Sequence, residues 1–209
     1  MSVMTTRHPD VPERGLTVDD LAHTPDDGRR YELVDGRLDV SPAPKPLHSV
    51  VDSRLTIHLG NTAPDEFVVL SGPGVNLNGD RTLHRIPDLA VFDHEPPEEG
   101  YFDIPPVLAV EIVSPESVLR DNHTKRHEYA AFGIRSYWIV NALADKVGLV
   151  ELRLEDGVYQ EAAQVHGEDV FETDLPFPVR LVPHWLTAGG PWRGRIGGEA
   201  PGEDQATQR

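Results

Sequence analysis

The feature that most restricts the fold is a run of seven residues, Val107–Val113, in which six side chains are apolar and the seventh is Glu111. An apolar run without alternation is typical of a strand whose two faces are both buried. Ser114 and Pro115 end the run, so we expect a central strand of a sheet that is covered on both sides. An unpaired charge within such a strand is strongly destabilising, and Glu111 therefore needs a cation beside it.

The segments around this strand show either helical or strand periodicity. Apolar residues four apart predict an amphipathic helix at 47–61, and the pair Asp35-Gly36 between two strand-like segments predicts a hairpin, because both turn residues favour positive φ. The other expected elements are a short helix at 17–23, strands at 67–70, 86–92 and 135–140, a helix at 121–132 and a hairpin after 147. This order predicts an α/β (α+β) fold, with a central mixed sheet flanked by helices and an extra N-terminal hairpin.

A chain of 209 residues suits one domain better than two. Residues 1–15 have no apolar periodicity and are expected to form a flexible leader. Residues 16–187 are expected to form the single domain. From residue 188 the composition changes to Gly, Pro and charge, so 188–209 is expected to be a disordered tail.

The net charge of −16 argues against a protein that binds nucleic acid through its bulk charge, because phosphate contacts need Lys and Arg. Part of the acid lies in loop-like segments at 93–99 and 199–204, so a less acidic site elsewhere stays possible. The absence of cysteine excludes disulfides, Cys-based zinc sites and a Cys nucleophile. The N-terminus lacks the apolar stretch of a signal peptide, and no stretch could span a membrane, so we expect a cytoplasmic protein without a membrane partner.

Asp88 raises the same question as Glu111 in a milder form, because it follows Pro87 in a segment that is otherwise apolar. If the two strands are neighbours, the two carboxylates can face one side of the sheet and share a divalent cation. Ligation by oxygen alone suits Mg²⁺ or Mn²⁺. The alternative is that Glu111 forms a purely structural pair with an Arg or a Lys.

Six segments, in order along the chain, resemble the Uma2 family of the restriction-endonuclease-like superfamily. They are Tyr31–Gly36, Ser41–Pro44 with His48 after it, Ile86–Val91, Val110–Pro115, the helix with Lys125 and Tyr129, and Gly133–Val140. The resemblance runs through most of residues 17–183. It implies a restriction-endonuclease-like fold, whose signature is Pro-Asp followed by Asp/Glu-x-Lys around a Mg²⁺ ion.

The resemblance also implies roles for individual residues. Asp88 corresponds to the aspartate of Pro-Asp and Glu111 to the acid of the second half of the signature. Glu32 is a further acid on the hairpin, which would hold the metal directly or through water. The chain departs from the signature at Val113, where the family pattern has a lysine. The resemblance implies that Lys125 on the following helix supplies the missing charge, whereas without it Lys125 reads as a surface residue paired with Asp121 four positions earlier.

His48 and Tyr31 are accessory candidates by their places in the family segments, with no role assigned. His123 and His127 have a spacing that can hold zinc, but the Glu of a zinc protease motif is missing.

These observations predict a Mg²⁺- or Mn²⁺-dependent phosphodiester hydrolase, a DNA endonuclease, with Asp88, Glu111 and Lys125 as catalytic residues. The alternative is a nuclease-fold module that binds a protein partner and has lost turnover. A homodimer is expected for an enzyme that must cut both strands of a duplex.

Overall fold

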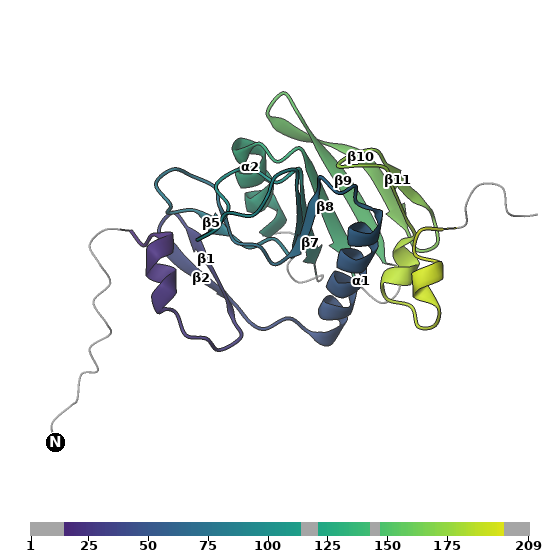
Figure 1. Ribbon diagram of the computed structural model, residues 1–209, viewed down its shortest axis with the longest axis horizontal. Helices are drawn as coiled ribbons and strands as arrows, with labels where there is room; N and C mark the ends of the chain where they lie inside the picture. Colours follow the sequence, from purple (N-terminus) through teal and green to yellow (C-terminus); the bar gives the residue numbers. More distant parts are fainter. Residues whose placement is uncertain (1–14, 114–120, 143–146, 199–209) are drawn as a thin grey trace, which may run out of the picture.

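The computed structural model describes residues 15–113, 121–142 and 147–198. Its strands are β1 (Arg30–Val34), β2 (Arg37–Ser41), β3 (Val68–Ser71), β4 (Val75–Asn76), β5 (His84–Arg85), β6 (Leu89–Phe92), β7 (Leu108–Val113), β8 (Ser136–Asn141), β9 (Gly148–Glu155), β10 (Val158–His166), β11 (Phe171–Thr173) and β12 (Val179–Leu181). Its α-helices are α1 (Pro46–Thr62) and α2 (Asp121–Phe132), and η1 (Val18–His23), η2 (Pro183–Leu186) and η3 (Trp192–Gly194) are 3-10 helices. Figure 1 shows these elements as a large sheet and a smaller N-terminal sheet beside it.

The large sheet has six strands in the order β10-β9-β8-β7-β6-β3. Strand β7 lies in its interior, antiparallel to β6 and parallel to β8, and all its residues are buried. The parallel pairing needs a crossover connection, and α2 lies in it. The expected mixed sheet with a central strand at 107–113 is therefore confirmed.

Two apolar layers cover the faces of this sheet. On one face, Leu108, Val110 and Ile112 of β7 belong to the cluster that also holds the buried side of α1. The alternate residue Ala109 lies in the second cluster, with Tyr129 of α2. Because successive side chains of a strand point to opposite faces, Glu111 lies on the α2 side of the sheet.

The small sheet has the order β2-β1-β5-β4 and contains the predicted hairpin. Its turn residues Asp35 and Gly36 have φ of 49° and 71°, as the Asp-Gly pair predicted. An added Cβ at Gly36 would lie 2.9 Å from the Gly15 Cα atom, so this turn requires glycine for space as well as for its backbone conformation.

The expected strand at 86–92 was wrong in its first half. The chain leaves the small sheet after Arg85 and enters the large sheet at Leu89, so Asp88 lies at the junction between two sheets. Pro87 has no N–H to donate to a sheet ladder, which is consistent with a break at this point.

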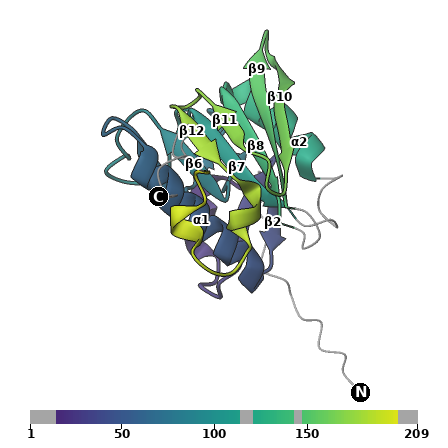
Figure 2. The same ribbon diagram turned by 90° about the vertical axis from the view of Figure 1, so that its right-hand side faces the viewer.

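The expected disordered tail was wrong for its first part, residues 188–198. Ile196 is 2% exposed, and the Val182 N–H donates to the carbonyl of Ile196 at 2.8 Å. The prediction was based on the Gly and Pro content of this segment. It gave no weight to the apolar residues that anchor the segment to α1. Figure 2 shows η2 and η3, in yellow, lying against α1.

Residues 1–14, Ser114, Pro115 and 199–209 lie outside the described residues. Among the helices of the described segments, none is long and apolar enough to cross a membrane.

Candidate active site

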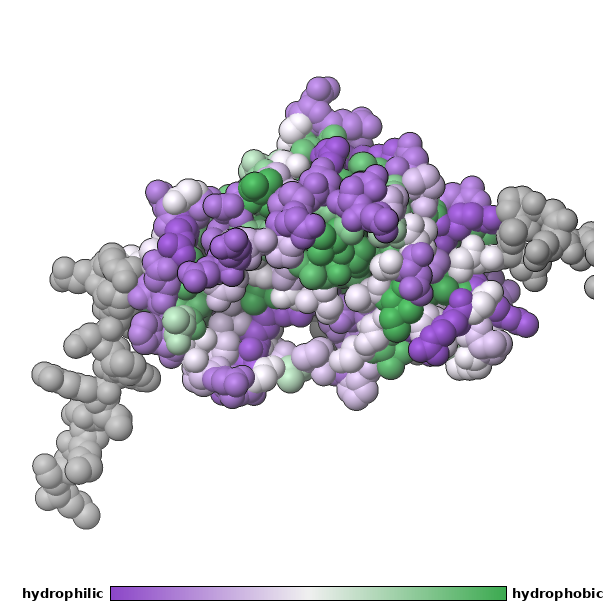
Figure 3. All heavy atoms as spheres, viewed as in Figure 1, coloured by the Kyte–Doolittle hydropathy of each residue, from purple (hydrophilic) through white to green (hydrophobic). Residues whose placement is uncertain are grey.

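A cleft of about 760 Å³ lies where the small sheet, the start of α1 and the end of β7 meet. Asp88, Glu111, Lys125 and His48 all line it, together with the Pro-rich connection at 41–45. In Figure 3 the surface is hollowed between the lobe of the small sheet and α1. Tyr31 lines it as well, so five of the sequence-predicted site residues share one cavity, although they come from five separate parts of the chain.

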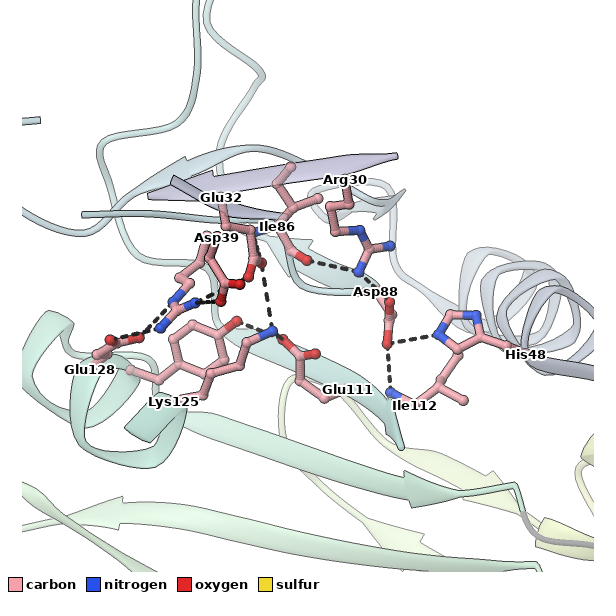
Figure 4. Close-up of polar contacts among 12 residues, drawn as sticks. Arg30, Glu32, Asp39, His48, Ile86, Asp88, Glu111, Ile112, Lys125 and Glu128 are labelled. Carbon is pink, nitrogen blue, oxygen red and sulfur yellow. Dashed lines mark hydrogen bonds and ion pairs between the residues drawn. The ribbon is translucent and has the colours of Figure 1, made fainter. Parts of the chain in front are cut away.

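Asp88 is buried and held by three groups (Figure 4). Arg30 Nη1 lies 2.6 Å from Oδ1, while His48 Nε2 at 3.2 Å and the Ile112 N–H at 2.7 Å both reach Oδ2. Burial opposes the ionisation of this carboxyl, but the hydrogen bond from His48 and the positive charge of Arg30 outweigh it and lower the pKa of Asp88 to about 2. Asp88 is therefore ionised at neutral pH.

Glu111 has a different environment on the neighbouring strand. Its Oε1 accepts hydrogen bonds from Lys125 Nζ at 2.9 Å and from the Tyr129 hydroxyl at 2.7 Å. Burial raises the pKa of Glu111 to about 7, the charges of Asp88 and Glu32 add to this effect, and Lys125 opposes it. The two cleft carboxyls thus have pKa values that are pushed apart, as is common in hydrolytic sites.

Lys125 reaches the site from the first turns of α2, and Val113 offers no charge in the position where the family signature has a lysine. The Lys125 ammonium lies 2.9 Å from Glu111 and 3.6 Å from Glu32. It is only 12% exposed, so the reading of Lys125 as a surface residue is wrong. Its charge is directed at the acid cluster, as the resemblance implied.

Glu32 lies in the cluster but its two oxygens are used inside the protein. Oε1 accepts the N–H of Ile86 at 2.8 Å, and Oε2 accepts Arg85 Nη1 at 3.1 Å. Arg85 also forms a bidentate pair with Glu128, at 2.7 and 2.9 Å. Desolvation works against ionisation of Glu32, but the charges of Lys125 and Arg85 lower its pKa. Glu32 thus positions Lys125 and Arg85, and it does not line the cleft.

The donors decide how well a divalent cation fits. Within the described segments, no three His, Asp or Glu residues are arranged as the ligands of one ion, so the expected set of Glu32, Asp88 and Glu111 around a common point is absent. Asp88 and Glu111 remain, and Mg²⁺ is commonly held by one or two carboxylates and water. Burial is the main cause of the raised pKa of Glu111, and a cation beside this carboxyl would favour its ionised form. These two carboxylates fit such a cation.

The accessory candidates separate into two groups. His48 contacts Asp88 directly, whereas the Tyr31 hydroxyl donates to Asp27 at 3.0 Å and lies on the wall of the cleft. His123 and His127 lie side by side on α2 with ring centroids 5.0 Å apart, and both are exposed. They contact no described part of the acid cluster.

Sequence reasoning missed Arg30 and Arg85, which compensate Asp88 and Glu32. Both arginines are separated from their acids by more than 50 residues along the chain. The sequence did contain one signal: Arg30 and Arg85 stand directly before segments that resemble the family, at strand positions where a buried charge requires a partner of opposite charge.

Comparisons with known proteins identify a family and a similar fold. A family model described as "Putative restriction endonuclease", Uma2, matches residues 18–187. A crystal structure from Anabaena variabilis ATCC 29413, described as "a putative nuclease belonging to DUF820", is similar with a TM-score of 0.58 and 16% identity, over 76% of this chain and 89% of that chain. No curated protein sequence matches. The match to the family model covers most of the chain and includes every residue of the acid cluster, and the chain belongs to the Uma2 family.

Proposed function

We propose that this protein is a metal-dependent phosphodiester hydrolase that cuts DNA. The observation that carries the proposal is the contact of Lys125 with Glu111 at 2.9 Å, in a cleft that Asp88 also lines. Two carboxylates and a lysine that line one cleft can hold a divalent cation and assist the attack of water on a phosphodiester. Membership of a family described as restriction endonucleases supports the same reaction.

Asp88 and Glu111 are the residues that would hold Mg²⁺ or Mn²⁺. A divalent cation at this place supplies positive charge to the phosphate oxygens and activates water. Asp88 is suited to this role because its pKa of about 2 keeps it ionised throughout the physiological range. Burial is the main reason for the raised pKa of Glu111. A bound cation would lower that pKa, because it attracts the carboxylate form.

The cations of the chain act on the substrate. Lys125 lies where its ammonium can orient an attacking water and offset negative charge that develops on the phosphate. Its ionisation is secured by Glu111 and Glu32, whose charges raise its pKa against the effect of burial. Arg30 and His48 contact Asp88 on the side away from Lys125 (Figure 4), and in this proposal they bind a phosphate next to the scissile bond.

The charge around the cleft differs from that of the whole chain. Four Lys or Arg and three Asp or Glu residues line the cleft, whereas the chain has a net charge of −16. Cations that gather at the cleft focus the local field there, so a polyanion would be attracted to this part of the molecule. The acidic composition is therefore compatible with a DNA substrate.

The experiment is cleavage of supercoiled plasmid, short duplexes, single-stranded DNA and RNA, each with Mg²⁺, Mn²⁺ or EDTA. We expect nicking with a metal and none in EDTA. Glu111→Gln should abolish nicking, and Lys125→Met should reduce it. Arg126→Met is the matched surface control for Lys125→Met and should cut as wild type does, because residue 126 lies about 100° around the helix. The reading fails if the wild-type protein cuts no nucleic acid with either metal, or if Glu111→Gln cuts as well as wild type.

One observation favours the second candidate, an inactive module that binds a protein. Each acid of the cluster already has an internal cation, since Arg30 pairs with Asp88, Lys125 with Glu111 and Arg85 with Glu32. Such an arrangement is stable without metal. It predicts no uptake of Mn²⁺ by titration calorimetry, whereas the nuclease predicts uptake that Asp88→Ala removes.

The proposed setting is the cytoplasm and the proposed assembly is a homodimer. A two-fold dimer would bring two clefts to the two strands of a duplex, whose symmetry it shares. Light scattering at micromolar concentration should give twice the mass of 23.1 kDa, and a monomer would remove this part of the proposal.

A further inference from the structure

The C-terminal part of the domain has an unusual charge distribution. Residues 175–198 contain no aspartate or glutamate, although the chain has 35 of them in 209 residues. The same segment contains Arg180, Arg193 and Arg195. A strongly acidic protein therefore has one stretch that is locally positive.

This stretch folds against α1 and gathers arginines and tryptophans on one surface. The Arg54 guanidinium lies 4.9 Å from the ring centroid of Trp192, and that of Arg193 lies 4.8 Å from the same ring. The Arg195 guanidinium lies 5.2 Å from the ring centroid of Trp185. We call these five residues the arginine–tryptophan patch.

The backbone fixes the patch in place. Arg54 Nη1 donates to the carbonyl of Trp185 at 2.9 Å and to that of Ala188 at 2.7 Å. Trp185 and Trp192 pack against the main apolar cluster with part of their surface. The indole rings are therefore held as a rigid support, while Arg193 and Arg195 are exposed beside them.

The arginines of the patch lack carboxylate partners within the described residues. Seven other described arginines each form an ion pair with an Asp or Glu, namely Arg29, Arg30, Arg81, Arg85, Arg135, Arg153 and Arg180. None of the described ion pairs includes Arg54, Arg193 or Arg195. The guanidinium groups of Arg54 and Arg193 lie within 5 Å of the same Trp192 ring centroid, at 4.9 and 4.8 Å, and burial together with the charge of Arg193 lowers the pKa of Arg54. A bound anion would relieve this repulsion.

We propose that the arginine–tryptophan patch binds a single-stranded segment of polynucleotide. Arginine side chains beside aromatic rings are the combination that binds single strands, because the cations contact phosphates and the rings stack on unpaired bases. Stacking requires base faces that a duplex keeps covered. Because guanidinium groups already lie over the rings of Trp192 and Trp185, unpaired bases would stack on the exposed guanidinium planes of Arg193 and Arg195, which the rings support, and this favours a single strand. The occupant is defined by this chemistry, phosphate together with an exposed base.

The patch lies on the same helix as the cleft. His48, in the first turn of α1, lines the cleft, and Arg54 follows six residues later, about 9 Å along the helix axis and about 120° around it. In Figure 2 the yellow C-terminal helices and α1 face the viewer together. One strand could thus contact both places, and the inference rests on the proposed function in taking nucleic acid as the ligand. Binding at the patch requires no metal and no cleavage.

The experiment measures binding in EDTA, so that cleavage does not contribute. A fluorescein-labelled 20-nucleotide oligo-dT is titrated with protein by anisotropy across a series of NaCl concentrations. The test variant is Arg193→Gln/Arg195→Gln, which changes two exposed side chains, and the charge-matched control is Arg81→Gln/Arg135→Gln. Loss of two phosphate contacts should reduce the salt slope by about 1.4 and weaken binding roughly 20-fold at 0.1 M salt. The control should bind within about twofold of wild type, since its changes lie outside the patch.

Tryptophan fluorescence provides a second readout. Binding of a strand next to Trp185 and Trp192 should quench their emission, and Trp192→Phe should reduce that quenching. The buried Trp138 gives a constant background. Inorganic phosphate and phosphatidylserine vesicles should not quench the tryptophan emission.

Equal binding by the test variant and the wild type would overturn the assignment, as would equal quenching by inorganic phosphate or by vesicles. Failure here is distinct from failure of the proposed function. Glu111→Gln should lose cleavage and keep oligo-dT binding, while the patch variant should lose binding and still take up Mn²⁺.

Discussion

His84 gives a quantitative test of the electrostatics beside the cleft. Its side chain is fully buried, its Nδ1 lies 2.9 Å from the Asn76 Oδ1 atom, and its ring packs against Tyr101 at 4.5 Å. Burial lowers the pKa of His84 to about 4, although the charge of Glu32 acts in the opposite direction. His84 is therefore neutral in the folded protein at physiological pH.

The lowered pKa predicts how His84 changes stability with pH. The unfolded chain takes up a proton at this imidazole near pH 6.5, whereas the folded protein does so only near pH 4. The unfolded state thus binds more protons between these two values, and the free energy of unfolding must fall as the pH decreases. The loss from this one group is about 2 kcal/mol by pH 5 and about 3 kcal/mol by pH 4.

The assay is urea unfolding of wild type and His84→Gln from pH 7.5 to pH 4, in EDTA. All other titrating groups are common to both proteins, so their contributions largely cancel in the difference. His84→Gln is expected to be the less stable protein at pH 7.5, and its deficit should shrink by about 3 kcal/mol at pH 4. A deficit that stays constant over this range, or a His84 ring that titrates by NMR near pH 6.5, would refute the reasoning.

Three further predictions concern other parts of the site. Lys125→Met should reduce metal-dependent cleavage at least about 100-fold in initial-rate assays, while Mn²⁺ affinity by calorimetry stays within a few-fold; unchanged cleavage would contradict the role of the lysine. Arg30→Met should destabilise the fold by about 2 kcal/mol at pH 7, because Asp88 keeps a buried charge with one cation fewer. Millimolar Mg²⁺ should restore part of the lost melting temperature, and a Tm equal to that of wild type both with and without Mg²⁺ would argue against a charged Asp88. Gly36→Ala should cost about 1–3 kcal/mol in chemical denaturation, since its φ is 71° and the new Cβ would meet the Gly15 backbone; a neutral result would mean that the turn readily changes type.

Local patterns in the sequence determined much of the fold. The apolar run at 107–113 identified the central strand, four-residue spacing identified α1, and the Asp35-Gly36 pair identified the hairpin. Each of these features depends on burial or on a turn conformation, and both are recorded by residues that are close together in the chain.

The sequence also showed that Glu111 needed compensation, but packing decided which group supplies it. Lys125 lies 14 residues after Glu111. It belongs to α2, in the crossover connection between β7 and β8, which packs against the sheet. Arg30 contacts Asp88, which lies 58 residues away in the sequence. Arg85 contacts Glu32, 53 residues away, and binds an oxygen that was expected to ligate the metal. No local pattern distinguishes a carboxylate that ligates a metal from one that pairs with an arginine.

The arginine–tryptophan patch depends even more on tertiary structure. Arg54 is a polar position on an amphipathic helix, and Trp192 lies in a Gly- and Pro-rich segment that composition assigned to a disordered tail. Their contact joins residues 138 positions apart. Composition records the average preference of a segment for water, whereas a few apolar anchors such as Ile196 decide whether that segment packs on the domain.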